Sequence, residues 1–372
     1  MRAVFVAALA VTLVTVLFNG HLKGAISDFF VLEFNANMND LISSPDSSFL
    51  SKATKISTGY EAPTTAEIRD DFSVTKDLDV WFDRSQTKAL LVQKDGEIIY
   101  QRYSSDADSG RNVNGLSMTK NIVALLIGIA IDEGKIGSEY DLIAHHVPEL
   151  NHEDNPGITV RDLLRHTSGV TSALSDLQST MTGKWLERDL AKITFQKDAP
   201  FTYDNLNYYL LNILLQNLYQ KPLSSIIEDK LWKPLSLSEA SIINTTGYCC
   251  MFAKADAWLA IGDLYLNGGG KTISSNWIEK MVEDTVSPEW FFVQATGKST
   301  NNTYGYHVYG GLPELPKVFW LEGMGLQLVM INPETNTVIV RLGGIPSKFS
   351  LKSNRYDSSL IDPLLKIIRE KY

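Results

Sequence analysis

The 372-residue sequence predicts an α+β fold, in which an antiparallel sheet is flanked by helices and an all-α subdomain is inserted. Three observations lead to this prediction. Strand-like runs occur near residues 88–100 and again at 318–342. Between them, residues 136–239 show helical spacing and loops without clear strand patterns. If the two ends share one sheet, a site is expected in the cleft between the sheet and the helical insertion.

Local patterns predict the elements of this fold in order. Lys94-Asp95-Gly96 separates the runs at 89–93 and 97–100 and indicates a β-hairpin. The long apolar run after Ser117 predicts a helix that is buried on every side and ends at Gly134. The later elements are a helix at 256–266, a strand at 318–320, a hairpin of 327–331 with 337–342, and an amphipathic closing helix at 358–372 with Pro363 in its first turn.

The same patterns give the domain organisation. Residues 77–372 form the predicted folded domain, with an α/β part at 77–135 and 240–372 and a helical subdomain at 136–239. Residues 25–76 are expected to be a linker or an N-terminal wrap, because the stretch from about 36 to 76 is rich in Ser, Thr, Asp and Asn and has little periodicity. In residues 1–24, an apolar run follows Met1-Arg2, as in a signal peptide or a membrane anchor. We expect a periplasmic or secreted protein, with anchoring of residues 1–20 in a membrane as the open alternative.

Composition excludes several classes of function. The net charge of −9 and the lack of any Lys/Arg block argue against nucleic acid or an anionic lipid surface as the main partner. The 6 histidines and 2 cysteines show no metal-ligand spacing, so we expect no metal and no other cofactor. Cys249 and Cys250 are adjacent in sequence. Because neighbouring cysteines pair only in a strained ring, we expect two free thiols.

The main chemical signal is Ser117-Met118-Thr119-Lys120 at the start of the apolar helix. This spacing places Ser117 at the helix N-terminus and Lys120 one turn later on the same face. Unpaired backbone N–H groups and the positive end of the helix dipole surround a serine in that position. A serine that has its own amine is a candidate nucleophile, although the same pattern also occurs as an ordinary N-cap.

A second chemical segment is Tyr203-Asp204-Asn205, which precedes a helix with an apolar face from Tyr208. On a loop, Tyr203 and Asn205 can both point into a cleft. The alternatives are that Tyr203 caps the loop and that Asn205 is the N-cap of the next helix. His166 could be considered as the base of a Ser-His-Asp triad, but the chain lacks the Gly-x-Ser-x-Gly elbow of such hydrolases.

Five motifs occur in a fixed order between residues 88 and 344. They are Ser117-Met118-Thr119-Lys120, Leu163-Leu164-Arg165-His166-Thr167-Ser168-Gly169, Tyr203-Asp204-Asn205, Leu231-Trp232-Lys233-Pro234-Leu235, and Asp263-Leu264-Tyr265-Leu266-Asn267-Gly268-Gly269. In this order they resemble the serine β-lactamase-related hydrolases of the class C type. That family includes D-alanyl-D-alanine carboxypeptidases, esterases and 6-aminohexanoate-dimer hydrolases. The resemblance implies a β-lactamase/transpeptidase-like fold.

The resemblance also implies roles for the residues of these motifs. Ser117 would be the nucleophile and would form an acyl-enzyme. Lys120 would accept its proton if partial burial lowers the pKa of the amine. Tyr203 would share this proton transfer and protonate the leaving group. Asn205 would hydrogen-bond Lys120 and the substrate, whereas His166 would belong to a structural turn.

The third motif of the family, Lys- or His-x-Gly on a strand beside the nucleophile, is altered here. In the best match Gly323 supplies the glycine, and Met324 supplies an oxyanion N–H together with that of Ser117. Leu321 stands where the family has a cation, and Glu322 would repel a substrate carboxylate if it faced the cleft. An ester, or a linear amide such as an aminohexanoate oligomer, is therefore favoured over β-lactams and D-alanyl peptides. The Gly-x-Gly-x-Gln form resembles the 6-aminohexanoate-dimer hydrolase branch.

The leading hypothesis is an exported serine hydrolase, a carboxylesterase or amidase, that cleaves a small-molecule ester or amide through a Ser117 acyl-enzyme. The alternative is a non-catalytic or very slow penicillin-binding or sensor-type protein on the same fold. The altered third motif and the apolar N-terminal run motivate it. An acyl-enzyme that forms without turning over would favour this alternative. The sequence leaves the oligomeric state open.

Overall fold

The computed structural model describes residues 53–58, 75–104, 112–153, 155–170, 190, 193–287, 303–344 and 360–369. The predicted signal or anchor at 1–24 lies outside these residues, as do the loop at 171–183 and most of the loop at 289–308. Within the described ranges, no helix combines the length and the apolar character that a membrane span requires.

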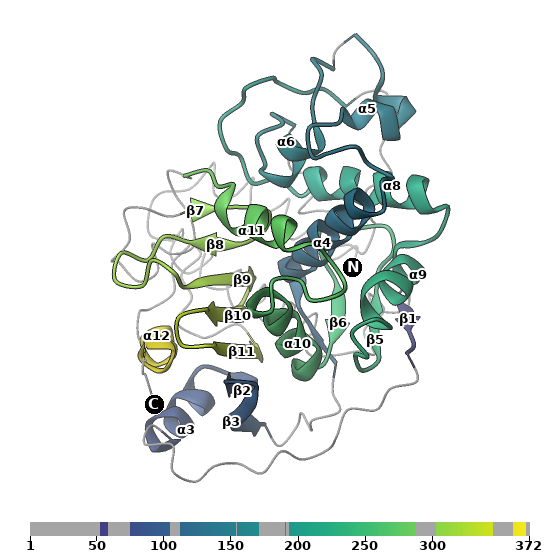
Figure 1. The fold of residues 1–372 in the computed structure, drawn as a ribbon. Coiled ribbons are helices and arrows are strands. Elements are labelled where there is room, and N and C mark those ends of the chain that lie inside the picture. The colour runs from purple at the N-terminus through teal and green to yellow at the C-terminus, as the bar shows by residue number, and fades with distance from the viewer. Residues whose placement is uncertain are drawn as a thin grey trace, which may run out of the picture.

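Seven strands from the two ends of the domain form one antiparallel sheet (Figure 1). Its order is β3-β2-β11-β10-β9-β8-β7, so the first hairpin pairs directly with the last strand. The prediction of an antiparallel sheet built from both ends of the domain is confirmed, as are its two hairpins. The strands are β2 Thr87–Lys94, β3 Glu97–Tyr103, β7 Thr303–Tyr304, β8 Tyr309–Gly310, β9 Phe319–Gly323, β10 Gln327–Asn332 and β11 Thr337–Gly343.

A second, smaller sheet was not expected from the sequence. It has the order β1-β5-β6-β4, with β1 Thr54–Ile56, β4 Val113–Asn114, β5 Ala240–Ile242 and β6 Met251–Ala253. Strands of two or three residues are too short for an alternating pattern to stand out. Strand β1 lies within the segment at 25–76 that was expected to be a linker, and it pairs with β5 across the domain.

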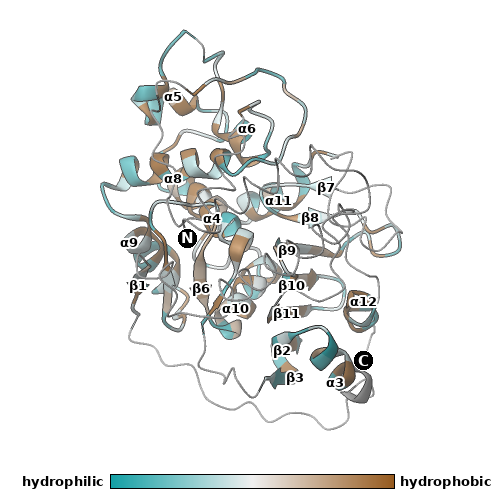
Figure 2. Cartoon of the chain, turned by 180° about the vertical axis from the view of Figure 1, so that it is seen from behind, coloured by the Kyte–Doolittle hydropathy of each residue, from teal (hydrophilic) through white to brown (hydrophobic). Residues whose placement is uncertain are grey.

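Alternate side chains of the large sheet enter two separate hydrophobic cores. Leu91 and Val340 are buried in the core that also holds the apolar residues of helices α4 (Thr119–Asp132) and α10 (Ala255–Leu266). Leu90 and Ile339 are buried in the core that holds those of helices α3 (Thr75–Arg84) and α12 (Asp362–Arg369). Figure 2 shows hydrophobic colour on the inner strands and on α10. Helices therefore flank the sheet on both faces, as predicted.

The helices follow the expected spacing where the sequence was periodic. The closing helix α12 begins at Asp362, with Pro363 in its first turn, and α10 and the helical region from α5 to α9 are also where the sequence placed them. Helices α3 and α11 were not predicted. The helices are α3 Thr75–Arg84, α4 Thr119–Asp132, α5 Ile143–His146, α6 Val160–Leu164, α8 Leu206–Tyr219, α9 Leu223–Ile227, α10 Ala255–Leu266, α11 Ser275–Glu283 and α12 Asp362–Arg369.

Helix α4 is the central element of the larger core. Its residues from Thr119 to Ala130 are all buried, as the continuous apolar run predicts. Helix α11 packs closely against it: the indole Nε1 of Trp277 donates a hydrogen bond to the carbonyl of Ala124 at 3.1 Å. A Cβ built on Gly128 would lie 2.1 Å from Trp277 Cδ1, so this contact requires a glycine.

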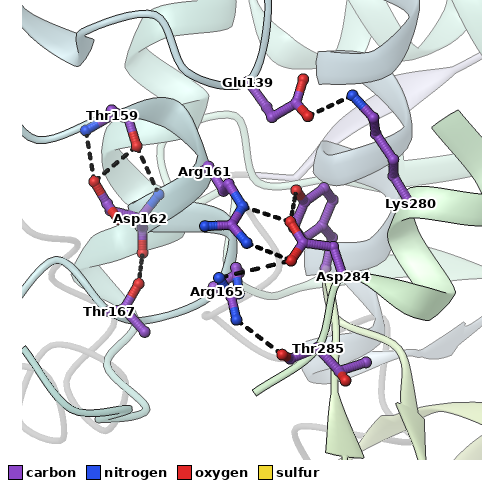
Figure 3. Close-up of polar contacts among 10 residues, drawn as sticks. Glu139, Thr159, Arg161, Asp162, Arg165, Thr167, Lys280, Asp284 and Thr285 are labelled. Carbon is purple, nitrogen blue, oxygen red and sulfur yellow. Dashed lines mark hydrogen bonds and ion pairs between the residues drawn. The ribbon is translucent and has the colours of Figure 1, made fainter. Parts of the chain in front are cut away.

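A cluster of charged residues fastens α6 to the end of α11 (Figure 3). The guanidinium of Arg161 binds the carboxylate of Asp284 through two nitrogens, and Arg165 lies 3.6 Å from the same carboxylate. Burial acts to raise the pKa of Asp284, but hydrogen bonds led by that from Arg161 hold it below its ordinary value. Glu139 and Lys280 form a neighbouring ion pair. The cluster fixes α6, and with it the turn that follows, against the sheet domain.

The close contact of α4 with α11 gives a stability prediction. Gly128→Ala adds a methyl group where there is no room, which costs about 1–3 kcal/mol and outweighs the helix-propensity gain of about 1 kcal/mol. Thermal unfolding should show a lower Tm. Gly137→Ala is the control, because a Cβ there would lie 3.0 Å from its nearest neighbour, the Asp141 carboxylate, which is a much smaller overlap than the 2.1 Å at Gly128. A Tm for Gly128→Ala at or above that of the wild type would contradict this account of the packing.

Candidate active site

Ser117 and Lys120 lie together at the first turn of α4. Ser117 belongs to a short 3₁₀ turn, Leu116–Met118, so the α-helix itself begins two residues later at Thr119. Lys120 is completely buried, whereas Ser117 is partly exposed. The Nζ of Lys120 donates to the Oγ of Ser117 at 3.1 Å and to the backbone carbonyl of Tyr248 at 2.9 Å. The predicted spacing of serine and lysine therefore becomes a direct contact.

Tyr203 lies beside the same amine. Lys120 Nζ is 4.8 Å from the centroid of the Tyr203 ring. The ring is stacked on His166, with centroids 4.6 Å apart and an interplanar angle of 22°. Asn205 occupies the N-cap position of α8, as the alternative interpretation proposed, but its side chain makes no capping hydrogen bond. The structure thus brings Ser117, Lys120 and Tyr203 into one place from segments far apart in sequence.

His166 hydrogen-bonds the backbone of the loop that carries Tyr203. Its Nδ1 accepts a hydrogen bond from the backbone N–H of Asp204 at 3.1 Å, and Asn207 Nδ2 lies 3.1 Å from the same atom. The carbonyl of His166 accepts from the N–H of Thr202 at 2.9 Å. Burial, followed by the nearby charge of Lys120, holds the pKa of His166 well below its ordinary value. Because Nδ1 already accepts from the backbone and the ring stays neutral, His166 fits the structural turn that the family resemblance implies.

The end of strand β9 lies against the turn that carries Ser117. A Cβ built on Gly323 would be 2.2 Å from the carbonyl oxygen of Gly115, so any larger residue would push the strand away from Ser117. Met324, the next residue, is 36% exposed at the beginning of the β9–β10 turn. The two residues that the altered third motif singled out are therefore next to the turn that carries the serine.

Leu321 and Glu322 are both buried and enter opposite faces of the sheet. Leu321 belongs to the larger hydrophobic core. The Glu322 carboxyl accepts a hydrogen bond from Trp320 Nε1 at 3.1 Å, and within the described residues its Oε1 has no partner. Burial raises the pKa of Glu322 to about 8, against the smaller effect of the Trp320 hydrogen bond. The sequence predicted repulsion of a carboxylate only if Glu322 faced the cleft. The side chain is buried, and its raised pKa favours the neutral form at pH 7.

Two buried polar residues hold the β9–β10 turn in place, and of these the sequence did not single out Arg341. Arg341 is fully buried and donates to the carbonyls of Gly325 and Leu326 in that turn. Gln327 bonds both the N–H and the carbonyl of Gly343, in the manner of a backbone peptide. A buried arginine must have hydrogen-bond acceptors for its N–H groups. An arginine within a run of apolar strand residues was therefore the sequence signal that could have identified Arg341 as a structural residue.

The sequence predicted two free thiols, and this prediction is wrong. Cys249 and Cys250, which are neighbours in the chain, form a disulfide bond. They end the tight connection from β5 to β6, in which Cys250 adopts a left-handed conformation with φ of 77°. This turn brings the two side chains together. In the described part of the chain, no group of three His, Cys, Asp or Glu side chains is arranged to hold a metal ion.

Comparison with known proteins finds similarity to one family of hydrolases. Residues 83–246 match the family model described as Beta-lactamase. Protein flp of Staphylococcus aureus (strain COL) is 25% identical over 174 residues, which cover 42% of this chain but only 35% of flp. The chain thus matches little more than a third of the length of that curated relative.

Solved structures share the fold at low sequence identity. A Bacillus anthracis protein described as a "putative 6-aminohexanoate-dimer hydrolase" has a TM-score of 0.70 and 16% identity, over 89% of this chain and 96% of that one. The D-amino acid amidase of Ochrobactrum anthropi SV3 has a TM-score of 0.55 and 13% identity, over 75% and 94%. The fold is β-lactamase/transpeptidase-like, and residues 83–246 are similar to the Beta-lactamase family.

The buried Glu322 gives a prediction about stability and pH. Its pKa is about 8 in the folded protein and 4.5 without the environment of the fold. Between these values only the unfolded chain loses the proton, so the residue lowers the free energy of unfolding as the pH rises. In Glu322→Gln this loss is absent. The stability of the variant relative to wild type should therefore rise by up to a few kcal/mol between pH 5 and pH 8.

Urea unfolding at a series of pH values measures this difference. Glu97→Gln, on the exposed end of β3, is the control for the loss of a carboxyl group at the surface. A Glu322→Gln difference that stays constant from pH 5 to pH 8 would show that the carboxyl is ionised in the folded protein.

Proposed function

We propose that the protein is a serine hydrolase that cleaves an ester or amide through an acyl-enzyme on Ser117. The observation that supports this most strongly is the contact of 3.1 Å between Lys120 Nζ and Ser117 Oγ, with the Tyr203 ring beside the same amine. A serine hydroxyl needs a base to accept its proton during attack. Burial disfavours the charged ammonium, and a neutral amine at this position is such a base.

The reaction follows from this arrangement. Lys120 keeps one N–H on the Tyr248 carbonyl and uses its lone pair to take the proton of Ser117 as Oγ attacks the substrate carbonyl carbon. The N–H groups of Ser117 and Met324 stabilise the oxyanion of the tetrahedral intermediate. As the intermediate collapses, the bond to the leaving group breaks. Tyr203 delivers its hydroxyl proton to the departing oxygen or nitrogen, and Lys120 passes the proton it took from Ser117 to the Tyr203 oxygen, which leaves the amine neutral again. Water then attacks the acyl-Ser117 ester by the same route and releases the acid.

The residues around the site favour substrates without a carboxylate near the scissile bond. Leu321 is apolar and fully buried, so it offers no cation to such a group. Because Glu322 is neutral at pH 7, the discrimination rests on this missing cation and not on repulsion. The fold neighbour named as a D-amino acid amidase adds support for amide substrates, and the one named as a hydrolase of aminohexanoate dimers points to linear amides.

Export is also part of the proposal. The apolar run at 3–18 has the length and flanking charge of a secretory signal. The disulfide Cys249–Cys250 supports a location in an oxidising compartment. Expression with and without residues 1–24, followed by fractionation, tests this: removal of the segment should retain the protein in the cytoplasm.

Substitution of the three central residues tests the catalytic proposal. Ser117→Ala should lower kcat/KM for a p-nitrophenyl ester by at least about 10³-fold, because it removes the nucleophile. Lys120→Met and Tyr203→Phe should lower it by about 10²–10⁴-fold, because each removes a proton carrier. Ser225→Ala, on α9, is the control and should keep wild-type activity. Wild-type turnover by Ser117→Ala would refute the proposal.

A substrate panel tests the proposed specificity. The wild type should hydrolyse p-nitrophenyl butyrate readily and 6-aminohexanoate dimer measurably, while nitrocefin, which carries a carboxylate beside its lactam, should be turned over at least about 10²-fold less efficiently. Steady-state kinetics with all three substrates at one pH gives the comparison. A kcat/KM for nitrocefin above that for the ester would overturn the substrate assignment. A stable acyl-enzyme without turnover on any substrate would favour the sensor alternative.

A further inference from the structure

We infer that the disulfide Cys249–Cys250 is a positioning element for Lys120, and that its reduction by a dithiol slows the acylation of Ser117. The inference rests on the proposed function of Ser117 and Lys120. It identifies Tyr248 as a positioning residue that acts through its backbone carbonyl, and it makes the activity of the site sensitive to thiol reagents.

The carbonyl of Tyr248 is a direct partner of the base. It accepts a hydrogen bond from Lys120 Nζ at 2.9 Å, on the same nitrogen that contacts Ser117 Oγ at 3.1 Å. A neutral amine has two N–H bonds and one lone pair. When one N–H is committed to a fixed carbonyl, the orientation of the lone pair is restricted. The position of Tyr248 O therefore controls whether the lone pair of Lys120 points at the serine hydroxyl.

The disulfide fixes the backbone immediately after that carbonyl. Cys249 and Cys250 are the next two residues, and the bond between their sulfur atoms closes a small covalent ring that includes the peptide between them. Cys250 has φ of 77°, a conformation that residues other than glycine adopt at a cost and keep only when their surroundings impose it. The covalent ring is such a constraint. Without it, the two residues can relax toward ordinary backbone angles.

Hydrogen bonds connect this turn to its surroundings on both sides. Thr246 Oγ1 donates to the carbonyl of Cys249 at 2.6 Å, and the N–H of Ile243 donates to the carbonyl of Cys250 at 3.3 Å. Strand β6 follows, and the N–H of Met251 donates to Thr119 Oγ1 at 3.1 Å in the first turn of α4. Relaxation at Cys249–Cys250 would therefore move the Tyr248 carbonyl relative to a helix turn that β6 holds in place.

The redox step uses a dithiol such as dithiothreitol. One of its thiolates attacks a cysteine sulfur, which breaks the S–S bond and forms a mixed disulfide. The second thiol then displaces the enzyme sulfur and leaves as a cyclic disulfide. Two electrons and two protons pass to the protein, and Cys249 and Cys250 become thiols. Cys249 is 7% exposed and Cys250 is buried, so reduction should be slow and should require a long incubation.

The test measures the second-order rate of Ser117 labelling by a fluorophosphonate probe over a range of pH. Oxidised wild type, reduced wild type and Cys249→Ala/Cys250→Ala are compared, and alkylation followed by intact-mass measurement verifies the thiol state. Reduction and the double substitution should each slow labelling by about ten- to a hundredfold and shift the pH at half-maximal rate. The double variant should not respond to dithiothreitol, and reoxidation should restore the wild type.

Circular dichroism at the assay temperature separates this effect from unfolding. Only samples with the spectrum of the oxidised protein are compared. In Lys120→Met, the residual labelling should be the same before and after reduction, because the disulfide acts through the amine. Equal rates and pH profiles for oxidised and reduced wild type would overturn the inference, as would an equal slowing in Lys120→Met. Failure of the proposed function gives a different result, in which oxidised wild type is not labelled at Ser117 at all.

Discussion

The site depends on one physical constraint, the burial of an amine that must reach a partly exposed hydroxyl. Lys120 is completely enclosed, yet its Nζ contacts both Ser117 Oγ and the carbonyl of Tyr248. A buried amine has to be hydrogen-bonded, and these two acceptors fix its direction. The proposed chemistry uses the same two contacts, because one orients the base and the other carries the proton.

The rest of the fold keeps the groups around this amine from moving. Helix α4 is buried along most of its length, so its first turn cannot shift without disturbing the larger core. The turn at His166 holds the Tyr203 loop through backbone hydrogen bonds, and the charged cluster of Arg161 and Asp284 fixes α6 just before that turn. Arg341 secures the β9–β10 turn on the other side of the serine. Each partner of the amine is thus attached to a different rigid part of the domain.

The sequence predicted two features of the site. One is a contact that helical spacing sets, and the other is a proximity that the order of the motifs implies. Ser117 and Lys120 are three residues apart, and helical spacing alone brings their side chains together. The proximity of Tyr203 to Lys120 could be expected only from the order of motifs, since no local rule joins residues so far apart. The large sheet was predictable because β10 and β11 are long and apolar, whereas strands as short as β4 leave no pattern.

Other features arise from the three-dimensional environment and have no local signal. The neutral form of Glu322 depends on how deeply β9 is buried, and the disulfide depends on how tightly the chain turns between β5 and β6. For the two cysteines, the usual behaviour of neighbouring thiols gave the wrong expectation. The placement of Gly323 against the turn that carries Ser117 likewise follows from the packing of two distant segments.

The most direct test of the central claim is to trap the acyl-enzyme itself. Wild-type protein is mixed with a p-nitrophenyl ester, quenched in acid during turnover, digested, and sequenced by tandem mass spectrometry. The account predicts that the acyl group lies on the Oγ of Ser117 and on no other side chain. An acyl group on a different residue, or sustained turnover in which no acylated Ser117 peptide can be trapped, would contradict it.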